Sequence, residues 1–140
     1  MISYETYEKI AVKKLHRKIS KKDNPDQHRS ISAPKTESQF LVAGPGSGKT
    51  TVMVLKVLKF IYVDDVNPSS ILATTFTRKA ASELRSRILS WGDEIRQALL
   101  KDQKYQDIHP HLRLLDFNQI ITGTLDSISH DILKLHRAPG

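Results

Sequence analysis

The chain has 140 residues, of which 39% are hydrophobic, which is enough for one domain with a buried core. It contains no cysteine, so disulfides and thiolate metal sites are excluded, and its six histidines lack the spacing of zinc ligands. Twenty-two Lys and Arg against fifteen Asp and Glu give a net charge of +7, which favours polyanionic partners such as nucleic acid or nucleotides.

The N-terminal segment is basic. Apolar residues recur at helical spacing from Tyr4 to Ile19, which predicts an amphipathic helix with a basic outer face, outside the core. We interpret residues 1–22 as a basic leader, and its cations can form a solvated helix face or contact nucleic acid. No acid interrupts the run of Lys9, Lys13, Lys14, Arg17, Lys18, Lys21 and Lys22. Asn24-Pro25 then starts a short second helix that ends by Pro34.

Three strand–turn–helix units follow one another along the rest of the chain. They comprise strand 39–43 with helix 49–63, strand 71–76 with helix 78–91, and strand 119–123 with helix 124–135. Such a series predicts an α/β fold with a parallel sheet flanked by helices. The polar segment 92–118 is expected to be a partly helical insertion at the rim of the sheet. Because no apolar run reaches the roughly 20 residues that cross a bilayer and no secretory signal starts the chain, we expect no membrane contact and a cytosolic location.

A glycine-rich loop lies between the first predicted strand and its helix. The loop reads Ala43-Gly44-Pro45-Gly46-Ser47-Gly48-Lys49-Thr50, with Ala43 where the P-loop pattern usually has glycine. Its glycines let successive N–H groups face phosphate oxygens, next to the positive end of a helix. Lys49 can neutralise the β- and γ-phosphates, and the Thr50 hydroxyl can ligate Mg²⁺. A glycine-rich structural turn is the alternative, but Lys-Thr at a helix start favours a P-loop NTPase that binds ATP with Mg²⁺.

Three further segments resemble motifs of superfamily 1 DNA helicases of the UvrD, Rep and PcrA type. Residues 71–88, ILATTFTRKAASELRSRI, resemble motif Ia, written TFTNKAAxEMxxRI. Residues 123–133 resemble motif Ib, GTFHSxxxRIL, with Leu125 and Asp126 where Phe and His are common. Residues 24–27, NPDQ, resemble the Q motif, whose glutamine reads the adenine edge. With the loop, the resemblance spans roughly residues 24–135 in the family's order.

This resemblance implies a RecA-like, incomplete first motor domain over residues 23–140 and assigns roles to individual residues. It implies that ATP is bound by Gln27, Ala43, Gly44, Pro45, Gly46, Ser47, Gly48, Lys49, Thr50 and Thr51, with Lys49 and Thr50 acting in catalysis. It implies that DNA is bound by Thr75, Phe76, Thr77, Arg78, Lys79, Thr124 and Ser127. Without the family, Phe76 is an ordinary core aromatic, and Thr51 stands where several relatives carry an arginine.

Hydrolysis of ATP in this fold also needs carboxylates after a later strand. No Asp-Glu pair follows Thr124, and we interpret Asp64-Asp65 and Asp116 as helix-end or turn residues. We therefore expect ATP binding with little turnover. The implied partners are single-stranded DNA, or a duplex with a single-stranded tail, and a second motor domain. A non-catalytic nucleic-acid-binding module and a small-molecule kinase are the alternatives.

Overall fold

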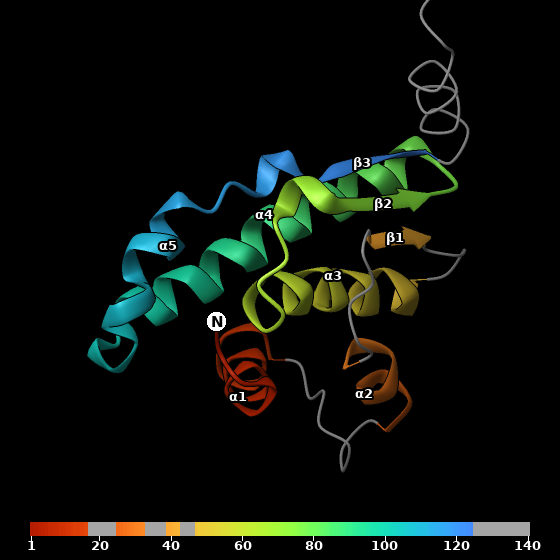
Figure 1. The fold of residues 1–140 in the computed structure, drawn as a ribbon. Helices are drawn as coiled ribbons and strands as arrows, with labels where there is room; N and C mark the ends of the chain where they lie inside the picture. The colour runs from red at the N-terminus through yellow and green to blue at the C-terminus, as the bar shows by residue number, and fades with distance from the viewer. Residues whose placement is uncertain (17–24, 33–38, 43–46, 125–140) are drawn as a thin grey trace, which may run out of the picture.

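The computed structural model describes residues 1–16, 25–32, 39–42 and 47–124, which form a mixed α/β fold (Figure 1). Three strands make one sheet in the order β1-β2-β3: β1 (Gln39–Val42), β2 (Ile71–Thr75) and β3 (Ile121–Thr124). Both pairings are parallel, with Val42 opposite Thr74 and Thr75 opposite Thr124. The predicted parallel sheet is confirmed in this part of the chain, and the carboxyl ends of its strands lie at one edge.

The described residues also form five α-helices. They are α1 (Tyr4–Leu15), α2 (Pro25–Ile31), α3 (Ser47–Tyr62), α4 (Arg78–Leu100) and α5 (His109–Leu114). Helix α4 lies against β2 and β3 and also contacts α3, while α1 contacts both α3 and α4 (Figure 1). Short 3₁₀ turns complete the connections, namely η1 (Pro68–Ser70), η2 (Gln103–Ile108) and η3 (Phe117–Gln119). No helix of the described segments has the length and apolar character that a membrane span requires.

Helix α1 belongs to the core, so the expectation that it lies outside is wrong. Its Tyr7, Ala11 and Leu15 are buried, in line with their helical spacing. The Tyr7 hydroxyl donates to the Leu55 carbonyl of α3 at 2.6 Å, which fixes α1 on that helix. The helix ends at Leu15 rather than at Ile19, because His16 takes a left-handed conformation with φ of 57°.

Helix α4 is longer than the sequence predicts. The sequence predicts that it ends at Trp91, but it continues to Leu100 and has 23 residues in all. Gly92 is there for packing: a Cβ at this position would lie 2.9 Å from two atoms of the Phe117 ring. The segment interpreted as a rim insertion therefore starts with the last turns of α4, and η2, α5 and η3 make up the rest. The third strand runs from Ile121 to Thr124 rather than over 119–123, so Thr124 belongs to the strand and not to the predicted third helix. The rest of that helix, residues 125–135, lies outside the described residues.

Helix α3 forms the centre of the core, as its nearly continuous apolar sequence predicts. Most side chains between Met53 and Tyr62 are buried, on several faces of the helix. Tyr62 donates its hydroxyl hydrogen to the Gly92 carbonyl at 2.6 Å, which joins α3 to α4. This contact lies at the end of α3 and in the middle of α4. The starts of the two helices follow β1 and β2 at the same edge of the sheet (Figure 1).

Candidate functional site

The glycine-rich sequence occupies the connection from β1 to α3. Strand β1 ends at Val42 and α3 begins at Ser47, so Ala43, Gly44, Pro45 and Gly46 lie outside the described residues. Ser47, Gly48 and Lys49 form the first turn of α3, but only their backbone is described. A helix start has N–H groups without partners inside the helix and carries a partial positive charge. The predicted strand before this motif and the predicted helix at its end are thereby confirmed, whereas the roles of its side chains stay predictions.

Thr50 and Thr51 follow in the same helix, and both are half-buried. The Arg87 guanidinium of α4 donates to the Thr51 hydroxyl, with 3.4 Å between Nη1 and Oγ1. Arg87 thus places a cation beside the first turns of α3 from the neighbouring strand–helix unit. Sequence reasoning missed this residue, although it belongs to the Arg-Ile end of the segment that resembles motif Ia.

The turn between β2 and α4 presents one ring and two cations. Phe76 is 57% exposed, and Arg78 and Lys79 are exposed at the start of α4. The interpretation of Phe76 as a core aromatic is therefore wrong. By contrast, Thr75 is buried, and its hydroxyl donates to the Thr77 carbonyl at 2.9 Å. These exposed groups can stack on a base and contact phosphates.

Thr77 shapes this turn as the N-cap of α4. Its hydroxyl oxygen accepts the Ala80 N–H at 3.1 Å, one of the donors that a helix start leaves without a partner. The Thr74 hydroxyl donates to the Leu41 carbonyl at 3.2 Å and so ties β2 to β1 beside the turn. The threonines therefore hold the backbone that presents Phe76.

The remaining predicted site residues are only partly described. Thr124 ends β3 directly opposite Thr75, which places the start of the motif Ib segment at the same edge as the motif Ia turn. Ser127 lies outside the described residues. Gln27 lies in α2, and its side chain is likewise outside what the structure describes.

The acidic residues that precede β3 have structural roles, as predicted. The Asp64 carboxylate lies 2.6 Å from the nearly buried Lys59 ammonium at the end of α3. Asp65 pairs with His111 at 3.1 Å, and Asp116 accepts the Asn118 N–H at 3.0 Å as the cap of η3. Among the described residues, no group of three or more His, Cys, Asp or Glu side chains could hold a metal ion. The hydroxyl of Thr50 therefore stays the predicted magnesium ligand of this part of the chain.

Comparison with known proteins supports the resemblance to helicases of the UvrD, Rep and PcrA type. A family model described as the UvrD/REP helicase N-terminal domain matches residues 23–138. The protein named DNA helicase II from Haemophilus influenzae is 35% identical over 113 residues, which cover 81% of this chain and 13% of that protein. DNA helicase II of Escherichia coli is 43% identical over a shorter stretch of 65 residues, which cover 46% of this chain and 9% of that protein. The chain thus spans only a small part of the length of these relatives.

A third relative has a different printed name. The protein named ATP-dependent DNA helicase UvrD1 from Mycobacterium leprae is 43% identical over 65 residues, which cover 46% of this chain and 8% of that protein. The similarity to proteins named as helicases therefore recurs in three organisms.

Proposed function

We propose, from the premise that the chain belongs to the UvrD/REP helicase N-terminal domain family, that it forms the ATP-binding part of a DNA helicase. One observation carries the proposal: β1, β2 and β3 run parallel in one sheet, so their carboxyl ends lie at one edge. The phosphate-loop sequence, the turn of the motif Ia segment and the start of the motif Ib segment therefore all lie at this edge. Open α/β sheets bind their ligands at this edge. In the longer protein, this edge binds ATP and single-stranded DNA side by side.

The nucleotide is held at the start of α3. Backbone N–H groups of the loop and the first helical turn surround the phosphates, and the Lys49 ammonium neutralises them. Mg²⁺ usually keeps several waters and takes only one or two protein ligands besides phosphates, so the single hydroxyl of Thr50 fits such an ion. The bound ion supplies charge neutralisation at the phosphates. Gln27 and Thr51 are proposed to contact the adenine base of the nucleotide.

The DNA strand is held at the turn after β2 and at the end of β3. The exposed ring of Phe76 stacks on a base, while Arg78 and Lys79 contact phosphates. Thr75 and Thr77 maintain the shape of the turn through the hydrogen bonds described above. Thr124 and Ser127 contact the same strand further along.

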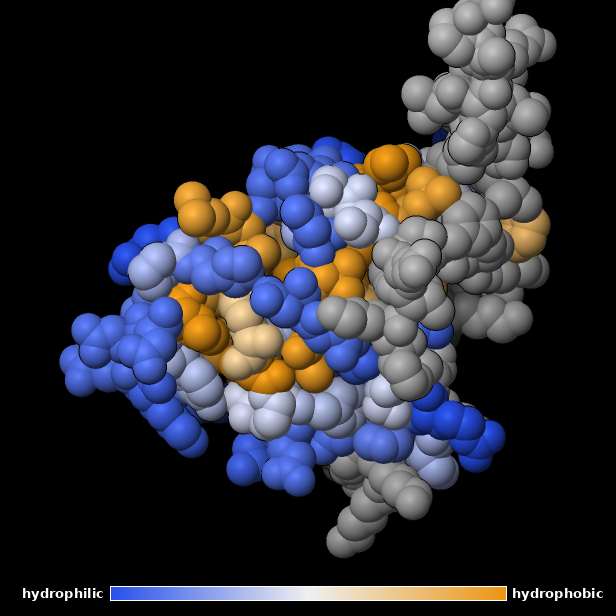
Figure 2. Space-filling view, viewed as in Figure 1, coloured by the Kyte–Doolittle hydropathy of each residue, from blue (hydrophilic) through white to orange (hydrophobic). Residues whose placement is uncertain are grey.

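The longer protein supplies what hydrolysis and unwinding additionally need. We propose that later segments contribute the carboxylates for water and Mg²⁺ and a second motor domain. Figure 2 shows hydrophobic side chains at the surface over β3, and Ile121 of this edge strand is 52% exposed. This exposed apolar edge supports the proposal that further structure continues the sheet in the longer protein.

Calorimetry with Mg-ATP tests the nucleotide site. The chain should bind Mg-ATP, and Lys49→Ala should abolish the heat of binding. Lys56→Ala is the matched control, because it removes a lysine from the same helix near the Phe60 ring, away from the loop. Equal heats for the wild type and Lys49→Ala would overturn the proposal.

DNA measurements separate the alternatives. In the longer protein, unwinding of a tailed duplex should require ATP and be lost with Lys49→Ala. Salt-sensitive DNA binding that responds neither to nucleotide nor to Lys49→Ala would indicate a non-catalytic nucleic-acid-binding module. Phosphorylation of a nucleoside in the absence of DNA would indicate a small-molecule kinase.

A further inference from the structure

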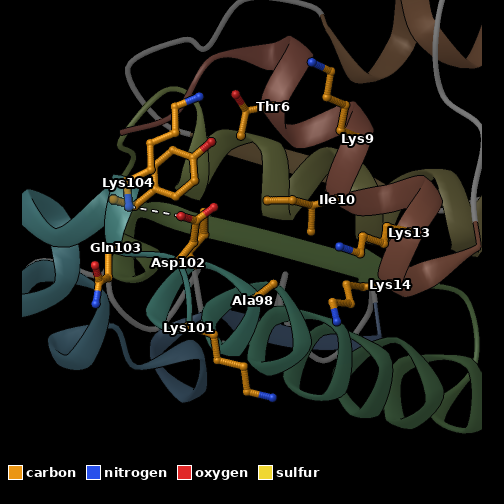
Figure 3. A pocket seen from close by; sticks show the side chains of 12 residues that line it. Thr6, Lys9, Ile10, Lys13, Lys14, Ala98, Lys101, Asp102, Gln103 and Lys104 are labelled. Carbon is orange, nitrogen blue, oxygen red and sulfur yellow. Dashed lines mark hydrogen bonds between the residues drawn. The ribbon is translucent and has the colours of Figure 1, made fainter.

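A basic pocket lies between α1 and the far end of α4, away from the sheet edge just described. Its volume is about 480 Å³, and five lysines from two separate parts of the chain line it (Figure 3). Lys9, Lys13 and Lys14 come from α1, whereas Lys101 and Lys104 follow the end of α4. The helical rise of 1.5 Å per residue places about 30 Å of α4 between Arg78 and Ala98 at the pocket.

The positive charge of this pocket exceeds the negative charge of the described residues that line it. Asp102 is the single carboxylate among the lining residues, and its oxygen accepts the backbone N–H of Lys104 at 3.0 Å. None of the five lysines forms an ion pair with another residue in the described part of the chain. Glu8, an acid of the same helix α1, instead lies 3.3 Å from His28. Convergence of like charges costs free energy, and a bound anion relieves that cost.

The two walls of the pocket are held in fixed relation. Helix α1 is anchored on α3 by the buried Tyr7 hydroxyl and by the Ile2 N–H, which donates to the Tyr62 carbonyl at 2.9 Å. Ile10 of α1 and Leu99 of α4 give the pocket an apolar lining, along which lysine stems can lie. The two walls that carry the lysines therefore hold their places before any ligand arrives, which lowers the entropy cost of binding.

We propose that this pocket binds phosphate groups of the DNA backbone, as a second DNA contact separate from the sheet edge. The proposal rests on the proposed function for the identity of the polyanion, because a protein that acts on DNA meets its phosphates at high local concentration. Phosphate contacts of lysines position DNA without reading its sequence. The pocket therefore strengthens binding to all DNA sequences alike and makes it more sensitive to salt.

Matched double variants test the pocket. Lys13→Gln/Lys104→Gln removes two charges from it, and Lys56→Gln/Arg113→Gln removes two charges elsewhere, from α3 and from an exposed site on α5. Fluorescence anisotropy with a labelled, tailed DNA duplex should show roughly tenfold weaker binding for the pocket variant. Its plot of log affinity against log salt should become shallower by about one unit per lysine removed. The control variant should keep the wild-type salt dependence and lose less than about twofold in affinity.

Each alternative outcome has a distinct meaning. Equal DNA affinities and salt slopes for the two double variants would overturn the pocket proposal, even if Phe76→Ala weakens DNA binding. Tripolyphosphate that binds the Lys49→Ala chain but not the Lys49→Ala chain with both pocket substitutions, while the pocket variant keeps the wild-type DNA affinity, would also overturn it. That result would favour a small phosphate ligand. A pocket variant that loses DNA binding while Lys49→Ala keeps ATP binding would support the pocket and contradict the proposed nucleotide site.

Discussion

The Arg87 guanidinium on α4 lies 3.4 Å from the Thr51 hydroxyl on α3. This contact joins two consecutive strand–helix units next to the helix start that follows the phosphate-loop sequence. Arg87 is half-buried, so its position is restricted by the packing of α4 on α3. Arg87 thus links the helix that follows the phosphate-loop sequence to the helix that begins after the exposed turn of Phe76.

Replacing Arg87 by alanine should weaken Mg-ATP binding. Loss of a hydrogen bond and a cation beside the proposed nucleotide site corresponds to about 1 kcal/mol, or roughly fivefold in affinity. Arg85→Ala is the matched control, because Arg85 lies on the same helix but donates to Asn118 at 2.8 Å. Calorimetry of the two variants makes the comparison, and equal dissociation constants would exclude a role of Arg87 at the nucleotide.

Truncation of the exposed ring should reduce binding of single-stranded DNA. Phe76→Ala should cost about 1–3 kcal/mol of binding free energy, the usual value for one stacked base. Because Phe76 is 57% exposed, the thermal midpoint of unfolding should stay close to that of the wild type. Leu114→Ala is the control, since Leu114 is an 81% exposed apolar residue on α5. If both variants bind single-stranded DNA equally well, Phe76 does not contact it.

Local features of the chain made the strands predictable. The apolar run that forms β1 lies directly before the glycines that precede Lys49. The apolar run that forms β2 likewise lies directly before its exposed turn. The exposure of Phe76, in contrast, depends on how α4 starts, and only the resemblance to helicases favoured it over a core position. Sequence alone could not tell whether Gly92 ends a helix or admits a ring from a distant segment.

Contacts between distant segments account for what the sequence did not reveal. The burial of α1 depends on Tyr7 meeting α3, far along the chain. The basic pocket likewise needs Lys13 and Lys104 on facing walls. The run of basic residues near the N-terminus indicated only the wall that α1 forms. Helical spacing predicted that α1 is amphipathic, but the element that covers its apolar face emerged only from the fold.

Addition of a single methyl group at Gly92 should destabilise the fold. The new Cβ would lie 2.9 Å from the Phe117 ring, which itself packs against Tyr62 and Arg96. Overpacking of this kind costs about 1–3 kcal/mol, whereas alanine in place of glycine inside a helix gains about 1 kcal/mol. Urea titration of Gly92→Ala should therefore give a free energy of unfolding about 1 kcal/mol below that of the wild type.

A smaller side chain in place of the Phe117 ring provides the control for this prediction. In the background of Phe117→Leu, the substitution Gly92→Ala should cost less than it does in the wild type, because the shorter side chain leaves room. The difference between the two costs measures the coupling of the two sites. Equal costs in both backgrounds would show that the ring is not what opposes a Cβ at Gly92.

Two buried tyrosines should make the protein sensitive to alkali. Tyr7 and Tyr62 each donate a hydroxyl hydrogen to a backbone carbonyl at 2.6 Å. Burial raises the pKa of both hydroxyls above the ordinary value of about 10. The unfolded chain therefore loses these protons first as the pH rises. The stability linked to them is fully present below about pH 10 and decreases above it, up to the raised pKa values of the folded state.

The expected decrease of the free energy of unfolding with pH is measurable. Each tyrosine should lower the free energy of unfolding by about 1.4 kcal/mol per pH unit in this range. Urea titrations at a series of alkaline pH values give the slope, and tyrosinate absorbance reports when the hydroxyls ionise. Tyr62→Phe should be less stable near neutral pH, because the Gly92 carbonyl loses its donor, yet its stability should fall less steeply with alkali. Tyr7→Phe should behave in the same way, and slopes identical to the wild type in both variants would show that ionisation of these hydroxyls does not drive alkaline unfolding.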